Sequence, residues 1–378
     1  MVAARSLGAC DYLEERPKAA RVDNTHMTRR AVVLISVVFL TICLNTSIRS
    51  QIAPCAQLKV TTLPAAGDYG GAGQFAVTLQ SIPHPDPDVP AAVSIFVPSN
   101  AGGANRVPVI FFAHGFGGFE YLYYEALLRQ LAGNGYIVVF APYTSNLLTS
   151  HTIRYQQMWS GFQLAVEQYG NLMDTTRAGF AGHSYGAGAV PELARRGAGA
   201  GWGSNGMFMF VMAAWYSWGN NYEQIPAAAK LVVQVYWEDG TNQHLISQND
   251  IWNRLPQIQE RRWQVIRSAR TTCALNSGHG LPVTGNASDA DGGGTTNAHD
   301  YWGIWRRIHA LADYTFTGNQ AAKPVAFGDD ARMGNWRLYA MRPITSLEAS
   351  TVPVVNSSTS PRFTWATRCL YSLGLPCS

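Results

Sequence analysis

The stretch that decides the fold is Thr176-Arg-Ala-Gly-Phe-Ala-Gly-His-Ser-Tyr-Gly-Ala-Gly188. It places Ser184 inside Gly-x-Ser-x-Gly, between a short apolar run and an Ala-rich segment that can form a helix. Gly182 and Gly186 remove the side chains that would collide where a strand turns sharply into a helix, so the serine hydroxyl is held outward. The pattern therefore predicts a nucleophilic serine. A phosphate-binding turn is the alternative interpretation of the same glycines.

A second motif lies about seventy residues upstream, where Val107-Pro-Val-Ile-Phe-Phe-Ala-His-Gly-Phe-Gly-Gly118 predicts a buried strand that runs into a Gly-rich loop. In acyl transfer the carbonyl oxygen becomes negative, and two backbone N–H groups aimed at it contribute about 3 kcal/mol each. An ordinary tight turn is the alternative for Gly115 to Gly118. The order of the two motifs along the chain favours a hydrolase site.

A serine hydroxyl needs a histidine to take its proton and a carboxylate to hold that histidine in the right tautomer. Where the serine follows a strand in this way, the chain order is serine, acid, histidine. The predicted strand at residues 231–236 ends in Glu238-Asp-Gly240, and we favour Asp239 as the acid. Glu238 is the competitor, since its side chain would leave the strand end on the opposite face. For either carboxylate, a solvated turn residue is the alternative.

The order rule also reduces the nine histidines to three candidates for the base. His279 lies in Asn276-Ser-Gly-His-Gly280, a loop after the apolar stretch from Trp263 to Ala274, and we predict that it is the base. His299 is the runner-up, although its place at a helix start suits a capping or surface role. His309 falls on a predicted helix, where packing is the better interpretation. The rule excludes His26, His84, His114, His151 and His183, and His244 lies too close behind the acid.

Composition and charge bound the class of protein. The chain has 378 residues, of which 47% are hydrophobic, so a large core and one catalytic domain with extensions are expected. The net charge of +4 is concentrated in residues 1–52, which hold seven Lys/Arg and four Asp/Glu. The remainder is close to neutral, so nucleic acid is not an expected partner. We expect a monomer.

The first residues have the pattern of a targeting segment. Thr28-Arg-Arg30 precedes the mostly apolar run Ala31 to Leu44, the form of a secretory signal, and it predicts a secreted or periplasmic protein. An uncleaved membrane anchor is the alternative, although the run is short for a span. Met27 is an alternative start. We divide the chain into a leader at 1–52, a catalytic domain at 53–345, and a linker with a Cys-bearing tail at 346–378.

Four cysteines follow the leader, namely Cys55, Cys273, Cys369 and Cys377. An even number suits an oxidising compartment, and four cysteines allow three pairings. We favour Cys369 with Cys377, which leaves Cys55 with Cys273. Unpaired thiols are the alternative for the second pair.

The remaining pattern alternates strands and helices, which predicts parallel strand–helix–strand units. Strands are expected at 74–81, 91–97, 107–113, 135–141, 207–214 and 231–236, and another delivers Ser184. Helices are expected at 121–134, 154–169 and 301–313. Residues 285–296 predict a flexible insertion, and residues 346–361 predict a polar linker.

With these residues in place, the chain over about residues 70 to 345 resembles the α/β-hydrolase superfamily. It is most similar to the branch of cutinase-like polyester hydrolases and dienelactone-hydrolase-like serine esterases. The residues that carry the resemblance are the loop at 114–118, the turn at 182–186, Trp215, Asp239 and the helix after His279. The resemblance implies a mostly parallel central sheet with helices on both faces. Asp239 follows Ser184 by only 55 residues of sequence, which leaves no room between them for a large lid domain.

The resemblance also implies site residues and an activity. The oxyanion donors would be the N–H groups of Phe116 and Tyr185, and Phe116 and Trp215 would line a shallow substrate cleft. A core aromatic at a strand end is the alternative for Trp215. The implied protein is a secreted serine esterase for small-molecule or polymeric esters, with Ser184, His279 and Asp239 as its triad and no metal or cofactor. Tyr236 and Trp237 stand where some polyester hydrolases carry a cysteine, which weakens the case for polymers. An acyltransferase or amidase with the same triad, or a non-catalytic binding protein of this fold, are the alternatives.

Overall fold

A mixed sheet of nine strands lies at the centre of the computed structural model, which describes residues 60–285, 293–337 and 341–376. The strand order is β1-β2-β4-β3-β5-β6-β7-β8-β11. Strands β3 to β8 run parallel, whereas β1, β2 and β11 pair antiparallel at the two edges. The strands are β1 (Val77–Ile82), β2 (Val93–Pro98), β3 (Val107–Ala113), β4 (Ile137–Phe140), β5 (Met173–His183), β6 (Met207–Met212), β7 (Lys230–Tyr236), β8 (Glu260–Ile266) and β11 (Leu347–Ser350).

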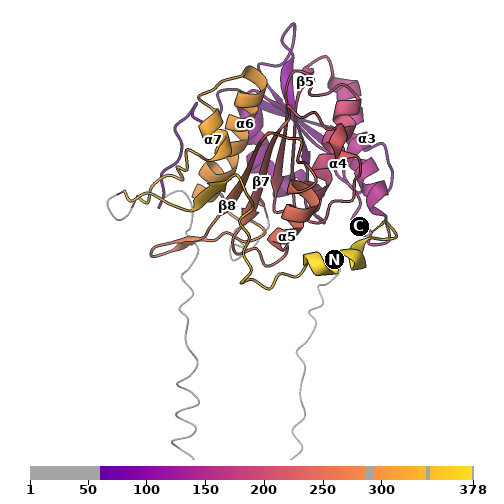
Figure 1. Ribbon diagram of the computed structural model, residues 1–378. Coiled ribbons are helices and arrows are strands. Elements are labelled where there is room, and N and C mark those ends of the chain that lie inside the picture. The colour runs from indigo at the N-terminus through magenta and orange to yellow at the C-terminus, as the bar shows by residue number, and fades with distance from the viewer. Residues whose placement is uncertain (1–59, 286–292, 338–340, 377–378) are drawn as a thin grey trace, which may run out of the picture. The chain divides into compact units, whose positions relative to one another are not determined.

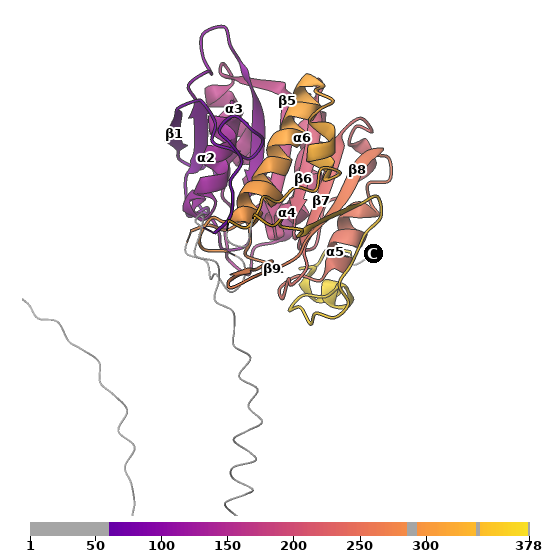
Figure 2. The ribbon, with the colours of Figure 1, turned by 90° about the vertical axis from the view of Figure 1, so that its left-hand side faces the viewer.

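Helices cover both faces of this sheet (Figure 1 and Figure 2). On one face lie α3 (His151–Tyr169) and α4 (Tyr185–Gly199), and on the other lie α2 (Glu125–Gly133), α6 (Arg306–Thr317) and α7 (Lys323–Phe327). Because both faces are covered, the central strands are almost continuously apolar rather than alternating. The shorter elements are η2 (Tyr121–Tyr123), η3 (Tyr222–Gln224), α5 (His244–Ser247), η4 (Gln248–Trp252), β9 (Ala269–Arg270), β10 (Ala274–Leu275), η6 (His299–Trp305) and η7 (Trp365–Tyr371).

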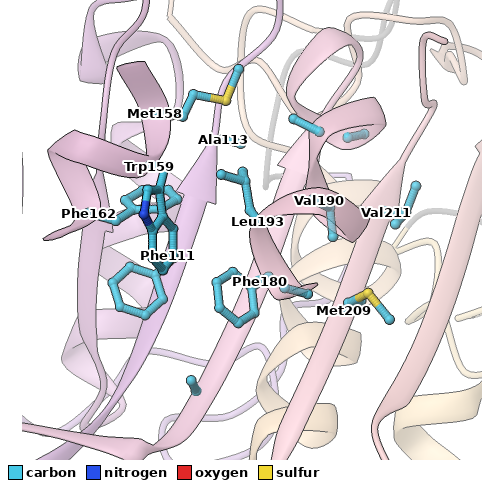
Figure 3. Close-up of a cluster of buried hydrophobic side chains, with 14 of the residues drawn as sticks. Phe111, Ala113, Met158, Trp159, Phe162, Phe180, Val190, Leu193, Met209 and Val211 are labelled. Atoms are coloured by element: carbon cyan, nitrogen blue, oxygen red, sulfur yellow. The ribbon is translucent and has the colours of Figure 1, made fainter. Parts of the chain in front are cut away.

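The core on the α3 and α4 side is aromatic (Figure 3). Phe111 of β3 stacks on Phe180 of β5 with ring centroids 5.4 Å apart, and on Trp202 at 4.7 Å. Both phenylalanines are essentially inaccessible to solvent. Since each buried aromatic side chain contributes about 1.5–3 kcal/mol of apolar transfer, this packing fixes β5, the strand that leads to Ser184, against its neighbours.

The mostly parallel sheet with helices on both faces agrees with the predicted fold class. Only α4, β6, η3 and β7 lie between Ser184 and Asp239 in the sequence.

The sequence prediction was wrong about the segment after Ser346. We expected a polar linker from Ser346 to Pro361, but Leu347–Ser350 form β11, which pairs with β8. The last parallel strand would otherwise expose a row of unpaired N–H and C=O groups, and β11 satisfies them. The apolar stretch expected after Trp263 is the end of β8 followed by the β9–β10 hairpin.

Several predictions fall on residues outside the described part of the chain. They include the leader at 1–52, most of the insertion at 285–296, and one member of each favoured cysteine pair, Cys55 and Cys377. Secretion and both pairings therefore stay predictions. Among the helices that the structure describes, none has the length and apolar character needed to cross a bilayer.

Candidate active site

Ser184 occupies the sharp turn between β5 and α4. Its backbone has φ 55° and ψ −119°, a region that costs a non-glycine residue about 1–3 kcal/mol. The turn packs too tightly for side chains on either flank. A Cβ on Gly186 would lie 2.2 Å from the carbonyl oxygen of Ala113, and one on Gly182 would lie 2.8 Å from the carbonyl carbon of Gly186. The two glycines therefore let the turn approach β3 and hold the serine hydroxyl at the strand end.

Three of the predicted site residues meet at this turn. The Oγ of Ser184 lies 2.9 Å from Nε2 of His279, and Nδ1 of His279 lies 2.9 Å from Oδ2 of Asp239. The other oxygen of Asp239 accepts the backbone N–H groups of Thr241 and Asn242, at 2.7 and 2.8 Å. Because the carboxylate accepts from Nδ1–H, Nε2 is left as the acceptor for the serine hydroxyl. This arrangement can remove the proton from Ser184.

The competing residues lie elsewhere. Glu238 is exposed and accepts the backbone N–H of Ser268. His299 was expected to have a capping or surface role, but it is fully buried, and its two ring nitrogens contact the carbonyl oxygen of Asn276 and the hydroxyl of Ser346. Through Asn276 it therefore supports the loop that carries His279. His309 is buried on α6 against the edges of Tyr69 and Tyr136.

The Gly-rich loop after β3 is held in place by its own histidine. His114 stacks on Tyr143 with ring centroids 4.2 Å apart, and its Nε2 accepts the backbone N–H of Tyr143. Its Nδ1 must then carry the proton, and it donates to the carbonyl oxygen of Gly115 at 2.7 Å. Burial lowers the pKa of His114 to about 3, so the ring is neutral. The same carbonyl accepts the N–H of Gly118, which fixes the loop on both sides of Phe116.

The backbone N–H groups expected to form the oxyanion hole border Ser184. Tyr185 is the first residue of α4, so its N–H has no acceptor within the helix. Phe116 lies in the loop facing it, with ring centroids of Phe116 and Tyr185 6.1 Å apart. The N-terminus of α4, which includes the N–H of Tyr185, attracts negative charge. The role of the two N–H groups stays a prediction.

His183 links the loop, the turn and the base in one hydrogen-bonded chain. Its Nε2 lies 2.9 Å from the carbonyl oxygen of His279, to which it must donate, so Nδ1 is an acceptor. The hydroxyl of Tyr124 therefore donates to Nδ1, at 2.9 Å, and itself accepts the backbone N–H of Gly115. Burial holds the pKa of His183 well below its usual value, so these proton positions are fixed near neutral pH. Sequence order excludes His183 as a base, and it gives no sign of this positioning role.

Two pockets open on the Ser184 hydroxyl and the His279 ring. The loop-side pocket, of about 330 Å³, is lined by Gly115 to Gly118, Tyr123, Tyr124, His183 and Val283. The tail-side pocket, of about 460 Å³, lies toward Trp215 and the C-terminal segment. A volume of this size suits a small organic ligand. Ser184 therefore borders two separate pockets, one on each side of its hydroxyl.

The walls of the tail-side pocket are aromatic and aliphatic. The aromatic side chains are those of Phe116, Tyr185, Trp215, Phe363 and Tyr371, and the aliphatic ones are those of Leu147, Leu370 and Leu373. Trp215 stacks on Tyr185 with ring centroids 5.4 Å apart and is mostly buried. It therefore both lines the pocket and belongs to the aromatic core, which unites the two interpretations of this residue.

The C-terminal segment, residues 361–375, forms a wall of this pocket that the sequence did not indicate. In Figure 1 it runs as the yellow segment along the end of the domain near α5 and α3. Phe363 exchanges backbone hydrogen bonds with Thr241 and Gln243, which directly follow the acid loop. Further along the segment, the carbonyl oxygen of Tyr371 accepts from His151 at 2.6 Å. The segment is thus attached on both sides of the pocket.

A buried ion pair anchors the middle of the same segment. Arg368 of η7 donates to Asp250 at 2.8 Å and also to the carbonyl oxygen of Ser217, and both charged side chains are nearly inaccessible. Burial raises the pKa of Asp250, and the neighbouring Arg368 guanidinium opposes that shift. Removal of Asp250 would leave Arg368 buried without a carboxylate, and removal of Arg368 would leave Asp250 with only the more distant Arg254, at 4.0 Å.

Comparison with known proteins gives one family match. Residues 67–196 match the family model of chlorophyllase. This segment includes β1 to α4, and with them the Gly-rich loop and the serine turn, but not Asp239 or His279. The match supports assignment to the α/β-hydrolase superfamily and a hydrolase activity. The resemblance to cutinases and dienelactone hydrolases stays a prediction. A search of curated proteins gives no match.

Proposed function

We propose that this protein is a secreted serine esterase that acts on carboxylic esters through an acyl-enzyme. The observation that carries the proposal is the continuous chain of two 2.9 Å hydrogen bonds from Asp239 through His279 to Ser184. The match of residues 67–196 to an ester-hydrolysing family supports the same reaction class. Secretion rests on the sequence of residues 28–44 alone.

In the proposed reaction, Oγ of Ser184 attacks the acyl carbon while Nε2 of His279 takes the hydroxyl proton. The carbonyl oxygen becomes an oxyanion and accepts hydrogen bonds from the backbone N–H groups of Phe116 and Tyr185. The ester bond breaks, and His279 returns the proton to the departing alcohol. Water then attacks the acyl-enzyme with His279 again as the base, and the acid leaves. Asp239 keeps Nδ1–H in place and stabilises the imidazolium that forms in each half.

The pockets on the two sides of Ser184 would hold the acyl and alcohol parts of the ester. A panel of test substrates should include chlorophyll, from which the matched family takes its name, and polyesters. No lid domain separates Ser184 from Asp239 in the sequence order, which favours an open site.

The test is labelling with a fluorophosphonate and turnover of 4-nitrophenyl esters, for the wild type and Ser184→Ala. We expect labelling to disappear in the variant and kcat to fall on the order of 10⁵-fold or more. Ser160→Ala, which changes a half-buried serine on α3 that lines neither pocket, is the matched control and should keep both signals. Turnover that persists in Ser184→Ala would reject the nucleophile.

A further inference from the structure

The tail-side pocket contains an imbalance of charge. Its lining includes two guanidinium groups, Arg154 of α3 and Arg362 of the C-terminal segment, and no carboxylate. Asp239, the acid of the site, accepts from His279 with one oxygen and from two backbone N–H groups with the other. Within the described part of the chain, neither arginine forms an ion pair with it.

Arg154 is a buried cation whose partners are all neutral. Its Nε and Nη2 donate to the carbonyl oxygens of Thr144 and Asn146, and the residue is only 3% exposed. Its guanidinium carbon lies 5.2 Å from the ring centroid of Phe116 and 5.5 Å from that of Tyr185. Carbonyl oxygens and ring faces fix the orientation of the group and weaken its field, but they do not cancel the charge.

Arg362 places a second positive charge at the exposed edge of the same pocket. Its guanidinium carbon lies 5.1 Å from the ring centroid of Phe363, and its backbone N–H donates to Gly240. Within residues 60–285, 293–337 and 341–376, neither Arg154 nor Arg362 takes part in an ion pair. Among the other buried arginines of this part of the chain, Arg306 and Arg368 pair with a carboxylate, whereas Arg307 donates only to carbonyl oxygens. Arg154 differs from Arg307 in that it lines a pocket beside Ser184.

We infer that the preferred substrate is an ester with a planar apolar body and a second, free carboxylate, which the arginines of the tail-side pocket recognise. The inference rests on the proposed esterase function. The aromatic walls would hold the planar body, and a carboxylate would pair with a guanidinium by charge-assisted hydrogen bonds. A buried cation without a counter-ion costs free energy, and an anionic ligand would relieve part of that cost.

Two matched pairs of esters, each with one charged and one neutral member, test the inference. In the first series the acyl group carries the charge: 4-nitrophenyl 4-carboxybenzoate is compared with 4-nitrophenyl 4-carbamoylbenzoate, its neutral isostere. In the second series the alcohol carries it, with the butyrate esters of 4-hydroxybenzoic acid and 4-hydroxybenzamide. We expect kcat/KM to favour the charged ester about tenfold in at least one series. Added NaCl should reduce this ratio, because salt screens the interaction.

Arg154→Met and Arg362→Gln then identify the recognising groups, with Arg342→Gln as the control that removes an exposed positive charge outside both pockets. The charged-to-neutral ratio should fall toward one in at least one of the first two variants and stay at its wild-type value in the control. A purely structural role for Arg154 would lower kcat/KM for both esters equally and leave the ratio unchanged. If Arg154→Met does not fold, Arg362→Gln and the salt series still test the ratio.

The outcomes distinguish failure of the inference about substrate charge from failure of the proposed esterase function. A wild-type ratio near one in both series, with unsubstituted 4-nitrophenyl benzoate turned over normally, would overturn the inference and leave the esterase intact. A ratio that neither arginine variant changes would also overturn it. Absence of turnover for every ester, including the unsubstituted benzoate, would instead reject the esterase function and the inference with it.

Discussion

The serine turn and the C-terminal segment both border Ser184, but they are built in different ways. The turn is local: Gly182 and Gly186 stand beside the residue whose backbone they permit. The C-terminal segment depends on residues far away in sequence, since its anchors are His151, Asp250 and the strand-like contact with Gln243. A site of this kind therefore combines chemistry that short motifs encode with specificity that tertiary contacts assemble. Each prediction below separates these two contributions, beginning with the largest expected effect.

The largest effect should distinguish the two buried histidines near the base loop. We expect His279→Ala to lower kcat on the order of 10⁵-fold, because the variant removes the ring nitrogen that contacts Ser184 Oγ and can take its proton. His299→Ala should reduce the free energy of unfolding by about 1–3 kcal/mol and kcat by less than tenfold, because it removes only hydrogen bonds that support the loop. Ester turnover and urea denaturation of both variants measure the difference. Equal losses of kcat would show that the loop, and not its imidazole, carries the effect.

The buried pair that holds the C-terminal segment should have the next largest effect. Arg368→Met removes the nearer cation from buried Asp250 and leaves only Arg254, at 4.0 Å; breaking a buried pair typically costs about 3–5 kcal/mol. We expect lower stability and a raised KM, with labelling of Ser184 by a small fluorophosphonate retained, because the serine turn does not depend on this pair. The double variant Asp250→Asn with Arg368→Met should recover much of the lost stability. If single and double variants are equally unstable, the ion pair is not the anchor.

A pH dependence should follow from His151, which connects the two regions. Its Nδ1 contacts the hydroxyl of Tyr185 and its Nε2 donates to the carbonyl oxygen of Tyr371. Burial lowers its pKa from about 6.5 to about 4. Because the unfolded chain binds the proton first, this contribution to stability is present above pH 6.5 and is lost as the pH falls toward 4.

We therefore expect the wild type to lose about 2 kcal/mol more than His151→Gln between pH 6.5 and pH 4.5, since each unit of pH is worth up to about 1.4 kcal/mol for one group. Urea denaturation at the two pH values measures it. Other buried histidines, including His114 and His183, add to the acid sensitivity of both proteins and cancel in the difference. Parallel stability profiles would mean that folding does not change the pKa of His151.

The smallest effect should come from the chain of hydrogen bonds through Tyr124. Tyr124→Phe removes the hydroxyl that connects the N–H of Gly115 to His183, and it leaves the ring packing unchanged. We expect kcat to fall about tenfold while KM for a neutral ester is retained, because the lost hydroxyl bonds to Gly115 and His183, whereas the ring that lines the loop-side pocket remains. Thermal denaturation should show a loss of about 1–2 kcal/mol. A raised KM with unchanged kcat would place Tyr124 in substrate binding.

The contrast also explains which parts of the molecule can be read from the sequence. The central strands β3, β4, β6 and β7 are predictable because each is a short and almost continuously apolar run. The edge strand β11 is not, because Leu347–Ser350 carry a glutamate and gain their order from pairing with β8. Chain order reduces the bases to three histidines, and geometry then brings His279 to Ser184.

The walls of the pocket were beyond sequence reasoning for a physical reason. Nothing in the composition of residues 361–375 indicates that Phe363 and Tyr371 face Trp215, since that contact depends on a backbone pairing across more than a hundred residues. His183 also gave no sequence signal of its positioning role. It stands next to the serine in the motif, but its role depends on Tyr124 and on the carbonyl oxygen of His279, both brought close only by the fold.

The two pockets that meet at Ser184 have a consequence for the order of events. In the proposed reaction, the alcohol produced in the first half-reaction would leave through one pocket while the acyl group still fills the other. The vacated opening is then accessible to whichever acceptor arrives first, water or a second alcohol. The ratio of hydrolysis to transesterification would thus depend on competition between water and alcohol for the vacated pocket. It would not require any change in the catalytic groups.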